Sequence, residues 1–192
     1  GVTPAIERYY AVIQALGERI IQVRMQRGDG VSMAKKAIRA VGNEGTFRKD
    51  IRDLMTRYCS GFVRTKMKIP TISSWFVDKL ATLASVCVTA RSTVQRDRSS
   101  REIIFPPEPE APPRFAKQLS LLAQGIAVKN GNPQVTDEEY RIVFRVALDS
   151  LPVANGGVIR LLIQRESVEE KDVQEALNLS KNSTYRLLED LT

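Results

Sequence analysis

The stretch Pro112–Ala127, PPRFAKQLSLLAQGIA, is the part of the sequence that decides how the rest is interpreted. Its two leading prolines suit the first turn of a helix, where a missing backbone N–H costs little. Leu119, Leu122 and Ile126 then recur at the spacing of one helical face. The stretch therefore predicts a single amphipathic helix, and its neighbours along the chain predict a fold in which helices dominate.

Arg114 is the one cation in the first turn of this predicted helix. The amino end of a helix is partly positive, so an arginine there is unfavourable unless a negative group approaches it. A phosphate fits well, because the guanidinium donates a planar pair of hydrogen bonds to its oxygens. A solvated arginine is the plainer alternative. Arg114 is thus a candidate phosphate ligand.

The composition is compatible with an anionic partner. The 192 residues carry a formal net charge of +7, and 43% of them are hydrophobic, which is enough for a core. This length allows one large or two small domains, and the charge suits nucleic acid or nucleotide phosphate. The chain has no histidine, which excludes histidine general bases, serine triads and most zinc sites, and we predict no metal ligands.

The cysteines and the apolar runs of the sequence indicate the cellular compartment in which the protein is expected. Cys59 and Cys87 lack the spacing of a metal site and lie in apolar helical contexts, so we expect buried free thiols in a reducing cytoplasm. No apolar run reaches membrane-spanning length, and no charged-then-apolar signal opens the chain, so we expect no membrane partner.

Residues 1–30 are predicted to be the incomplete edge of an α/β core. They contain a strand end at Val2–Thr3, a helix from Pro4 and a strand at Ile20–Met25, which is too little for an independent domain. The chain opens abruptly at Gly1, as if cut from a longer protein, so we expect a fragment.

Residues 31–150 are predicted to form a second, helical domain. Periodic apolar positions and capping residues place helices at Ser32–Val41, Thr46–Val63, Ser74–Thr93, Pro112–Ala127 and Thr136–Ser150. Between the third and fourth helices, Arg91–Arg101 has four arginines and no apolar stripe, so we expect an exposed basic loop. A short strand is predicted at Glu102–Phe105.

Residues 151–192 are predicted to form a helix-turn-helix domain. Helices at Val158–Ile163, Glu169–Leu177 and Lys181–Leu191, with a tight turn before the last, follow that plan. The last helix would then place its first residues in the major groove. These candidate nucleic-acid contacts are Lys181, Asn182, Ser183, Thr184, Tyr185 and Arg186. A three-helix packing unit without a DNA role is the alternative, and a β-wing after Thr192 is not part of the chain.

Three residues together carry a resemblance to a known family. Thr3 ends a strand, Arg19 stands in Leu16–Ile20 (LGERI) before the next strand, and Arg114 begins a helix after several others. This order resembles the C-terminal half of an AAA+ ATPase of the minichromosome-maintenance-like branch. The resemblance implies that Thr3 is sensor 1, Arg19 the arginine finger for a neighbouring subunit, and Arg114 sensor 2 on a helical lid.

The resemblance also implies a function for the parent protein. Neither a Gly-x-x-x-x-Gly-Lys-Ser/Thr loop nor an acidic Walker B strand is present, so ATP and Mg²⁺ are expected to bind elsewhere in the parent. The expected fold is mainly α, with an α/β edge, a lid bundle and a (winged) helix-turn-helix. The parent would couple ATP hydrolysis in a cytoplasmic ring to DNA binding or remodelling.

Two interpretations without catalysis stay open. A helical, DNA-binding transcription regulator explains the charge, the missing phosphate loop and the last three helices. A protein-interaction module, with the helix-turn-helix as a packing unit, is the second. The regulator does not explain the position of Arg114 or the incomplete α/β edge. Within the ATPase interpretation, helicase, loader and regulator are not distinguished.

Overall fold

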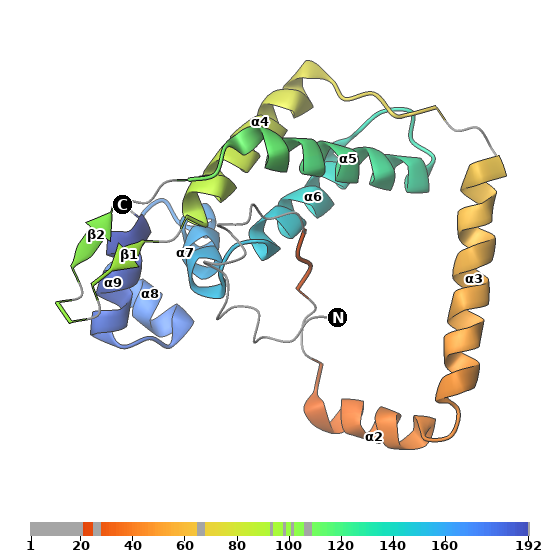
Figure 1. The fold of residues 1–192 in the computed structure, drawn as a ribbon, viewed down its shortest axis with the longest axis horizontal. Coiled ribbons are helices and arrows are strands. Elements are labelled where there is room, and N and C mark those ends of the chain that lie inside the picture. The colour runs from red at the N-terminus through yellow and green to blue at the C-terminus, as the bar shows by residue number, and fades with distance from the viewer. Residues whose placement is uncertain are drawn as a thin grey trace. The chain divides into compact units, whose positions relative to one another are not determined.

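The computed structural model describes residues 21–24, 28–64, 68–92, 94–97, 99–100, 102–105 and 109–191. The described chain is mainly helical, which confirms the predicted fold class. Its helices are α2 (Gly30–Ala40), α3 (Glu44–Arg64), α4 (Ser74–Ala90), α5 (Pro112–Asn130), α6 (Asp137–Asp149), α7 (Val153–Gln164), α8 (Glu170–Leu177) and α9 (Lys181–Leu191). Strands β1 (Gln95–Arg96) and β2 (Ile103–Phe105) form one short antiparallel hairpin (Figure 1).

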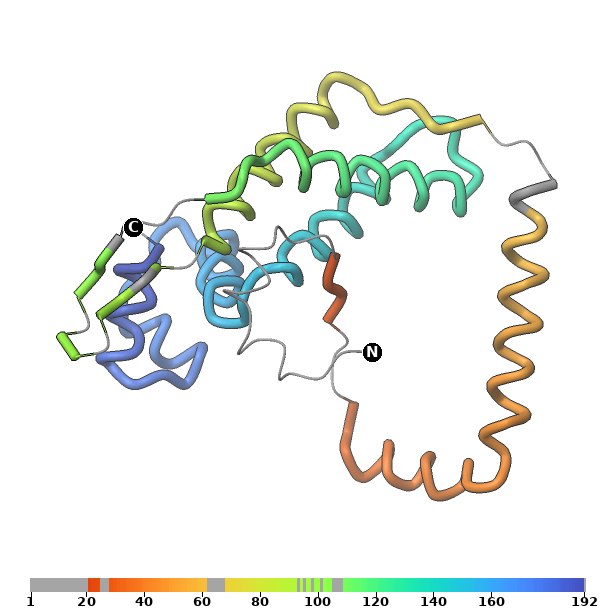
Figure 2. The backbone as a smooth tube through the Cα atoms, in the orientation of Figure 1, coloured from red at the N-terminus to blue at the C-terminus, as the bar shows by residue number. Residues whose placement is uncertain are grey.

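The chain divides into two compact units. One contains α2 and α3, and the other contains the hairpin and the helices from α4 to α9, together with residues 21–23. The predicted domain boundaries at 30 and 150 stay predictions. Figure 2 follows the backbone through α4, the hairpin and α5 in the larger unit.

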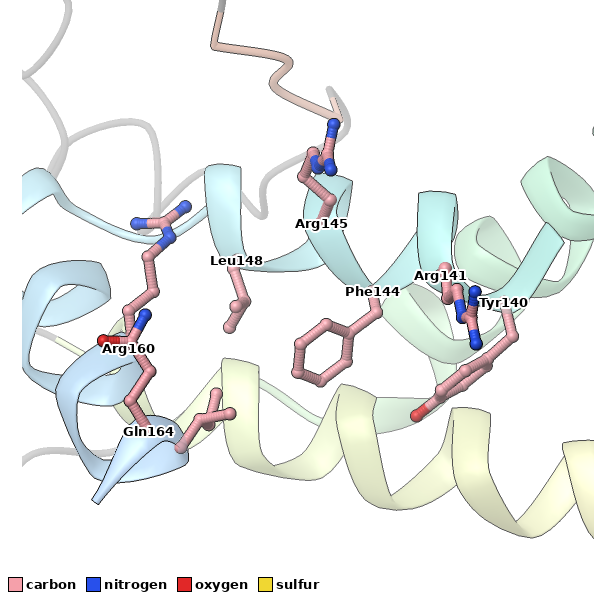
Figure 3. Close-up of a pocket in the computed structure, with 8 residues that line it drawn as sticks. Tyr140, Arg141, Phe144, Arg145, Leu148, Arg160 and Gln164 are labelled. Carbon is pink, nitrogen blue, oxygen red and sulfur yellow. The ribbon is translucent and has the colours of Figure 1, made fainter. Parts of the chain in front are cut away.

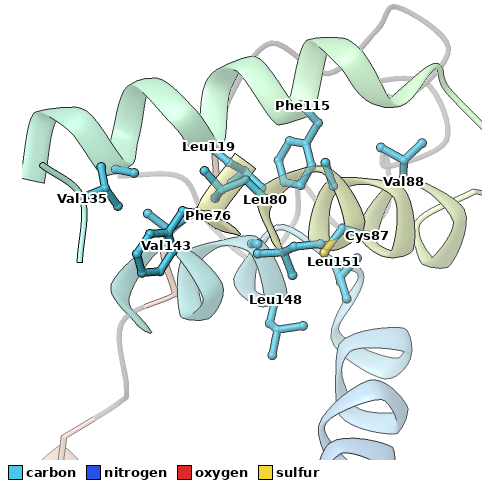
Figure 4. Packing of buried hydrophobic residues seen from close by; sticks show 14 of the residues in the cluster. Phe76, Leu80, Cys87, Val88, Phe115, Leu119, Val135, Val143, Leu148 and Leu151 are labelled. Carbon is cyan, nitrogen blue, oxygen red and sulfur yellow. The ribbon is translucent and has the colours of Figure 1, made fainter. Parts of the chain in front are cut away.

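The core of the larger unit lies where α4, α5 and α6 pack together. Leu80 and Cys87 of α4, Phe115 and Leu119 of α5, and Val143 of α6 are almost fully buried (Figure 4). The full set of buried positions on each helix contains residues at three- and four-residue spacing, so each helix buries one face. The predicted helix over 112–127 is therefore present and extends to Asn130.

Local sequence sets the ends of α5 and α6. Two prolines occupy the first turn of α5, and Gly131 ends the helix with a φ of 75°, a left-handed conformation that glycine adopts without strain. Thr136 and Glu139 form the predicted capping box at the start of α6. The connection between α5 and α6 is consequently short and well defined.

Glu139 joins this connection into one hydrogen-bonded cluster. Its fully buried carboxylate accepts hydrogen bonds from Asn130 Nδ2 at 2.8 Å, from Asn132 Nδ2 at 2.7 Å, and from both the backbone N–H and the hydroxyl of Thr136. Burial by itself raises the pKa of the Glu139 carboxyl, but these hydrogen bonds lower it to about 2. The ionised form is thus the form that the fold requires.

Replacing Glu139 with glutamine is expected to lower the free energy of unfolding by about 2 kcal/mol at neutral pH, because buried donors lose a charged acceptor. In the unfolded chain the carboxyl has an ordinary pKa of ~4.3. The pKa of this carboxyl is lower in the folded chain. Its contribution to the free energy of unfolding is therefore complete at pH values above the unfolded pKa and is lost as pH falls toward about 2. Urea unfolding at several pH values checks this. The exposed neighbour Glu138 supplies the control, Glu138→Gln, and an equal loss in both variants would contradict it.

Three local predictions are wrong. Arg91, expected in an exposed loop, is 1% exposed and lies over the Phe115 ring at 4.5 Å. The strand expected at 20–25 is absent from its described residues, 21–24. Cys59, expected to be buried, is exposed. Cys87 is buried as expected, and this burial raises the pKa of its thiol to about 11, although the positive charge of Arg91 acts to lower it.

The smaller unit has two helices without a shared core. Asp29 caps α2 by accepting hydrogen bonds from the backbone N–H groups of Val31 and Ser32. None of the residues of α2 is buried, and the described side chains of α3 are all exposed. The helices are therefore defined by local sequence, not by packing of one on the other.

Candidate nucleic-acid interface

The helices α7, α8 and α9 form a three-helix unit at the end of the chain. Its second and third helices are joined by a three-residue turn in which Asn178 has a φ of 52°. Asparagine tolerates this left-handed conformation better than most residues, and it ends α8. Gly157 of α7 lies so close to α8 that an added Cβ would come within 2.4 Å of Leu177. The glycine thus permits the close packing of α7 on α8.

The start of α8 differs slightly from the prediction. The helix is predicted to begin at Glu169, but Glu169 is the capping residue before the helix, and Asp172 completes a capping box with it. The backbone N–H of Glu169 and the Arg165 guanidinium lower the pKa of the Asp172 carboxyl. The bounds of α8 and α9 nevertheless lie within one residue of those predicted.

The first turn of α9 is held by Ser180. Its hydroxyl accepts a hydrogen bond from the backbone N–H of Ser183 at 3.3 Å, an arrangement that satisfies an unpaired donor at the helix start. Thr184 donates its hydroxyl hydrogen to the Ser180 carbonyl at 3.1 Å and is fully buried. Thr184 is therefore unavailable to a nucleic acid, which corrects its place among the predicted contacts.

The other five predicted contacts are exposed and share the first two turns of α9. They combine two cations, an amide, a hydroxyl and a phenol, and Tyr185 is 61% exposed. Hydrogen-bond donors of this kind serve both phosphate oxygens and base edges. The exposed residues are Lys181, Asn182, Ser183, Tyr185 and Arg186.

Acidic residues elsewhere in the unit restrict where an anion can bind. The sequence of α8 has more acidic than basic side chains, so its exposed face repels phosphate. At the far end of α9, Arg96 of β1 pairs with Glu189 at 2.8 Å and also with Asp190. Acidic groups at the carboxyl end of a helix are unfavourable, and Arg96 offsets them. The amino end of α9 is thus the part that suits a polyanion.

The pairing of Arg96 also brings the β1–β2 hairpin against α9 (Figure 1). Asp97 shapes the turn between the strands by accepting hydrogen bonds from the backbone N–H groups of Ser99 and Ser100. A hairpin beside the last helix is the position of a wing in winged helix-turn-helix proteins, but here the hairpin precedes the unit in sequence. The sequence alone predicts a loop and a lone strand at this point, so the hairpin is a difference from that prediction.

Of the predicted nucleotide contacts, only Arg114 lies within the described residues. Thr3 and Arg19 lie outside them. The Arg114 side chain is 53% exposed, and its Nη1 lies 3.9 Å from Glu110 Oε1. The other carboxylate oxygen of Glu110 accepts a hydrogen bond from buried Arg91 at 2.9 Å. Glu110 therefore supplies part of the negative charge that Arg114 requires, and the exposed guanidinium still fits a phosphate.

A shallow cavity of about 500 Å³ lies between α6 and α7 (Figure 3). Figure 3 shows Phe144 and Leu148 pointing to one side of α6 and Arg145 to the opposite side. Arg160 at its edge pairs with Asp149 at 2.8 Å. None of the residues predicted to contact nucleotide or nucleic acid lines this cavity.

Within the described ranges, no three His, Cys, Asp or Glu side chains are grouped so that they could hold a metal ion. The same part of the chain contains no helix of the length and apolar character needed to cross a membrane.

The fold and the exposed side chains define a mainly helical protein with a C-terminal three-helix unit. No protein-family model, curated protein or solved structure matches this chain. The resemblance to AAA+ ATPases accordingly rests on the residues quoted from the sequence.

Proposed function

We propose that the chain binds duplex DNA through the amino end of α9. The observation that carries the proposal is the division of this helix start into one buried residue, Thr184, and five exposed polar or cationic ones. A buried anchor with exposed donors around it allows a helix to approach a groove without losing its packing. Lys181 and Arg186 would contact phosphates, and Asn182, Ser183 and Tyr185 would lie nearest to the bases.

Hydrogen exchange with and without a duplex tests where DNA binds. Protection by DNA is expected at residues 180–187 of the chain, with little change in α3 or α5. Single-stranded DNA of the same length serves as the control, because a helix placed in the major groove requires a duplex. Protection confined to other elements, or none at saturating duplex, would contradict this placement and favour the packing-unit interpretation.

The second candidate function is nucleotide binding, and the half-exposed side chain of Arg114 favours it. In the proposed AAA+ parent, a cytoplasmic ring, Arg114 would donate hydrogen bonds to a nucleotide phosphate at the start of the lid helix α5. The phosphate loop, with ATP and Mg²⁺, would belong to the parent, and ATP hydrolysis would be coupled to DNA binding or remodelling. A non-enzymatic regulator remains the alternative.

Replacing Arg114 or Arg19 with alanine is expected to slow ATP turnover by the parent protein, by about 10³-fold or more for Arg19 if it acts as a finger in trans. The physical reason is the loss of a positive charge beside the phosphoryl group that is transferred. Turnover rates of the parent with Lys117→Ala, an exposed cation one turn along α5, provide the control. Turnover that is absent, or indifferent to both arginines, would support the regulator instead.

A further inference from the structure

The helix α3 presents an apolar stripe that the described chain leaves exposed. Phe47, Ile51, Leu54, Met55 and Tyr58 are between 45% and 63% exposed, although each is a large hydrophobic side chain. Scattered exposed apolar residues need no explanation, but a continuous stripe on one helix marks an interaction surface. Most of the stability of a helix in a protein comes from packing of its apolar face, so a partner on this stripe would stabilise α3.

The spacing of the stripe is that of a coiled-coil seam. Phe47, Ile51, Leu54 and Tyr58 are separated by four, three and four residues, which is the alternation of the a and d positions of a heptad. Asp50 and Arg57 then occupy successive g positions along one edge of the seam. The opposite edge carries Arg48 and Met55 at successive e positions. The seam thus has one edge with both signs of charge and one edge with a single cation.

We propose that α3 pairs with α3 of a second copy of this chain, in antiparallel orientation. In that orientation Ile51 packs against Leu54 of the partner copy and Phe47 against its Tyr58. The two g edges face each other, so Asp50 lies opposite Arg57 of the partner copy, and the two-fold symmetry repeats the pair. The surface is therefore complementary to itself in charge, and each layer of the seam pairs two large apolar side chains.

The charge pattern distinguishes this pairing from a parallel one. Parallel helices place each g position opposite the following e position of the partner. Asp50 would then face Met55, which gives no ion pair. Among the described residues neither Asp50 nor Arg57 takes part in an ion pair, and Arg57 Nε donates a hydrogen bond to the Asp53 carbonyl of its own helix. Both charges are thus available to a second copy.

Charge exchange on the full chain tests the pairing by analytical ultracentrifugation. The wild-type mass is expected to rise with concentration from 21.5 kDa toward twice that value. Asp50→Arg and Arg57→Asp, each alone, replace two attractive pairs by two repulsive ones and are expected to weaken the dimer about tenfold. The double variant restores the pairs with reversed polarity and is expected to recover the wild-type affinity.

The matched controls are Asp53→Arg and Lys49→Asp, which make the same charge changes away from the g edge. They are expected to leave the dimer affinity unchanged, whereas Leu54→Gln at the centre of the seam is expected to abolish pairing. A chain that stays monomeric, a dimer unaffected by the single exchanges, or a double variant as weak as the single ones would each overturn the proposal. DNA affinity is measured in a separate experiment, so a failure of the DNA-binding proposal is distinguished from a failure of the pairing.

Discussion

Replacing Lys181 and Arg186 together with alanine is expected to weaken the affinity of the chain for duplex DNA by about 30-fold, or roughly 1 kcal/mol for each lost phosphate contact. Both side chains are exposed in the first two turns of α9, and no described residue pairs with either. Each lost contact also releases one fewer counterion, so the salt dependence of binding becomes shallower. Fluorescence anisotropy with a labelled duplex measures both quantities.

The control for this prediction removes the same charge from other helices. Lys117→Ala with Arg141→Ala deletes one lysine and one arginine from exposed positions on α5 and α6. This pair is expected to change affinity only slightly, through the reduced net charge. An equal loss in both double variants would mean that the chain attracts DNA through its overall charge and that α9 has no special role.

The second large effect concerns stability. Glu110→Ala is expected to lower the free energy of unfolding by about 3 kcal/mol, because it removes the carboxylate that accepts a hydrogen bond from the buried Arg91 guanidinium. Arg91 is 1% exposed, and the Glu110 side chain is only 15% exposed. Water therefore cannot easily replace the lost partner. Denaturant unfolding followed by circular dichroism measures the change.

A second substitution separates loss of the ion pair from loss of packing. If Arg91 is replaced by methionine in the Glu110→Ala chain, the buried charge disappears and much of the stability is expected to return. The stacking of Arg91 on Phe115 would be kept in part by the methionine side chain. A double variant less stable than Glu110→Ala would show that the Arg91 side chain stabilises the fold through other contacts.

The helices of the larger unit are predictable from local signals, except that α7 begins at Val153 and not at the predicted Val158. The spacing of Leu119, Leu122 and Ile126, the capping box at Thr136 and the turn before Lys181 each act within a few residues. The burial of Thr184 had a local signal too, since Thr184 continues the stripe formed by Leu187, Leu188 and Leu191. Its hydroxyl group, which is typical of exposed positions, favours the opposite prediction from sequence alone.

The features that the sequence did not reveal depend on distant partners. Arg91 directly follows the end of α4, four residues after the buried Cys87, but its partners Glu110 and Phe115 lie farther along the chain. The hairpin is positioned by Arg96, whose partners on α9 are more than ninety residues away. Residue types and spacing cannot pair such groups without the fold. The predicted roles of Thr3 and Arg19 lie outside the described residues and stay predictions.

The salt dependence of duplex binding by the intact chain tests the proposed DNA interface most directly. Binding constants measured over a range of salt concentrations are expected to fall linearly on logarithmic axes, with a slope of about −0.9 for every phosphate contacted. Removing Lys181 and Arg186 is expected to reduce that slope by about two. Absence of binding at low salt, or a slope unchanged by these two substitutions, would contradict the account.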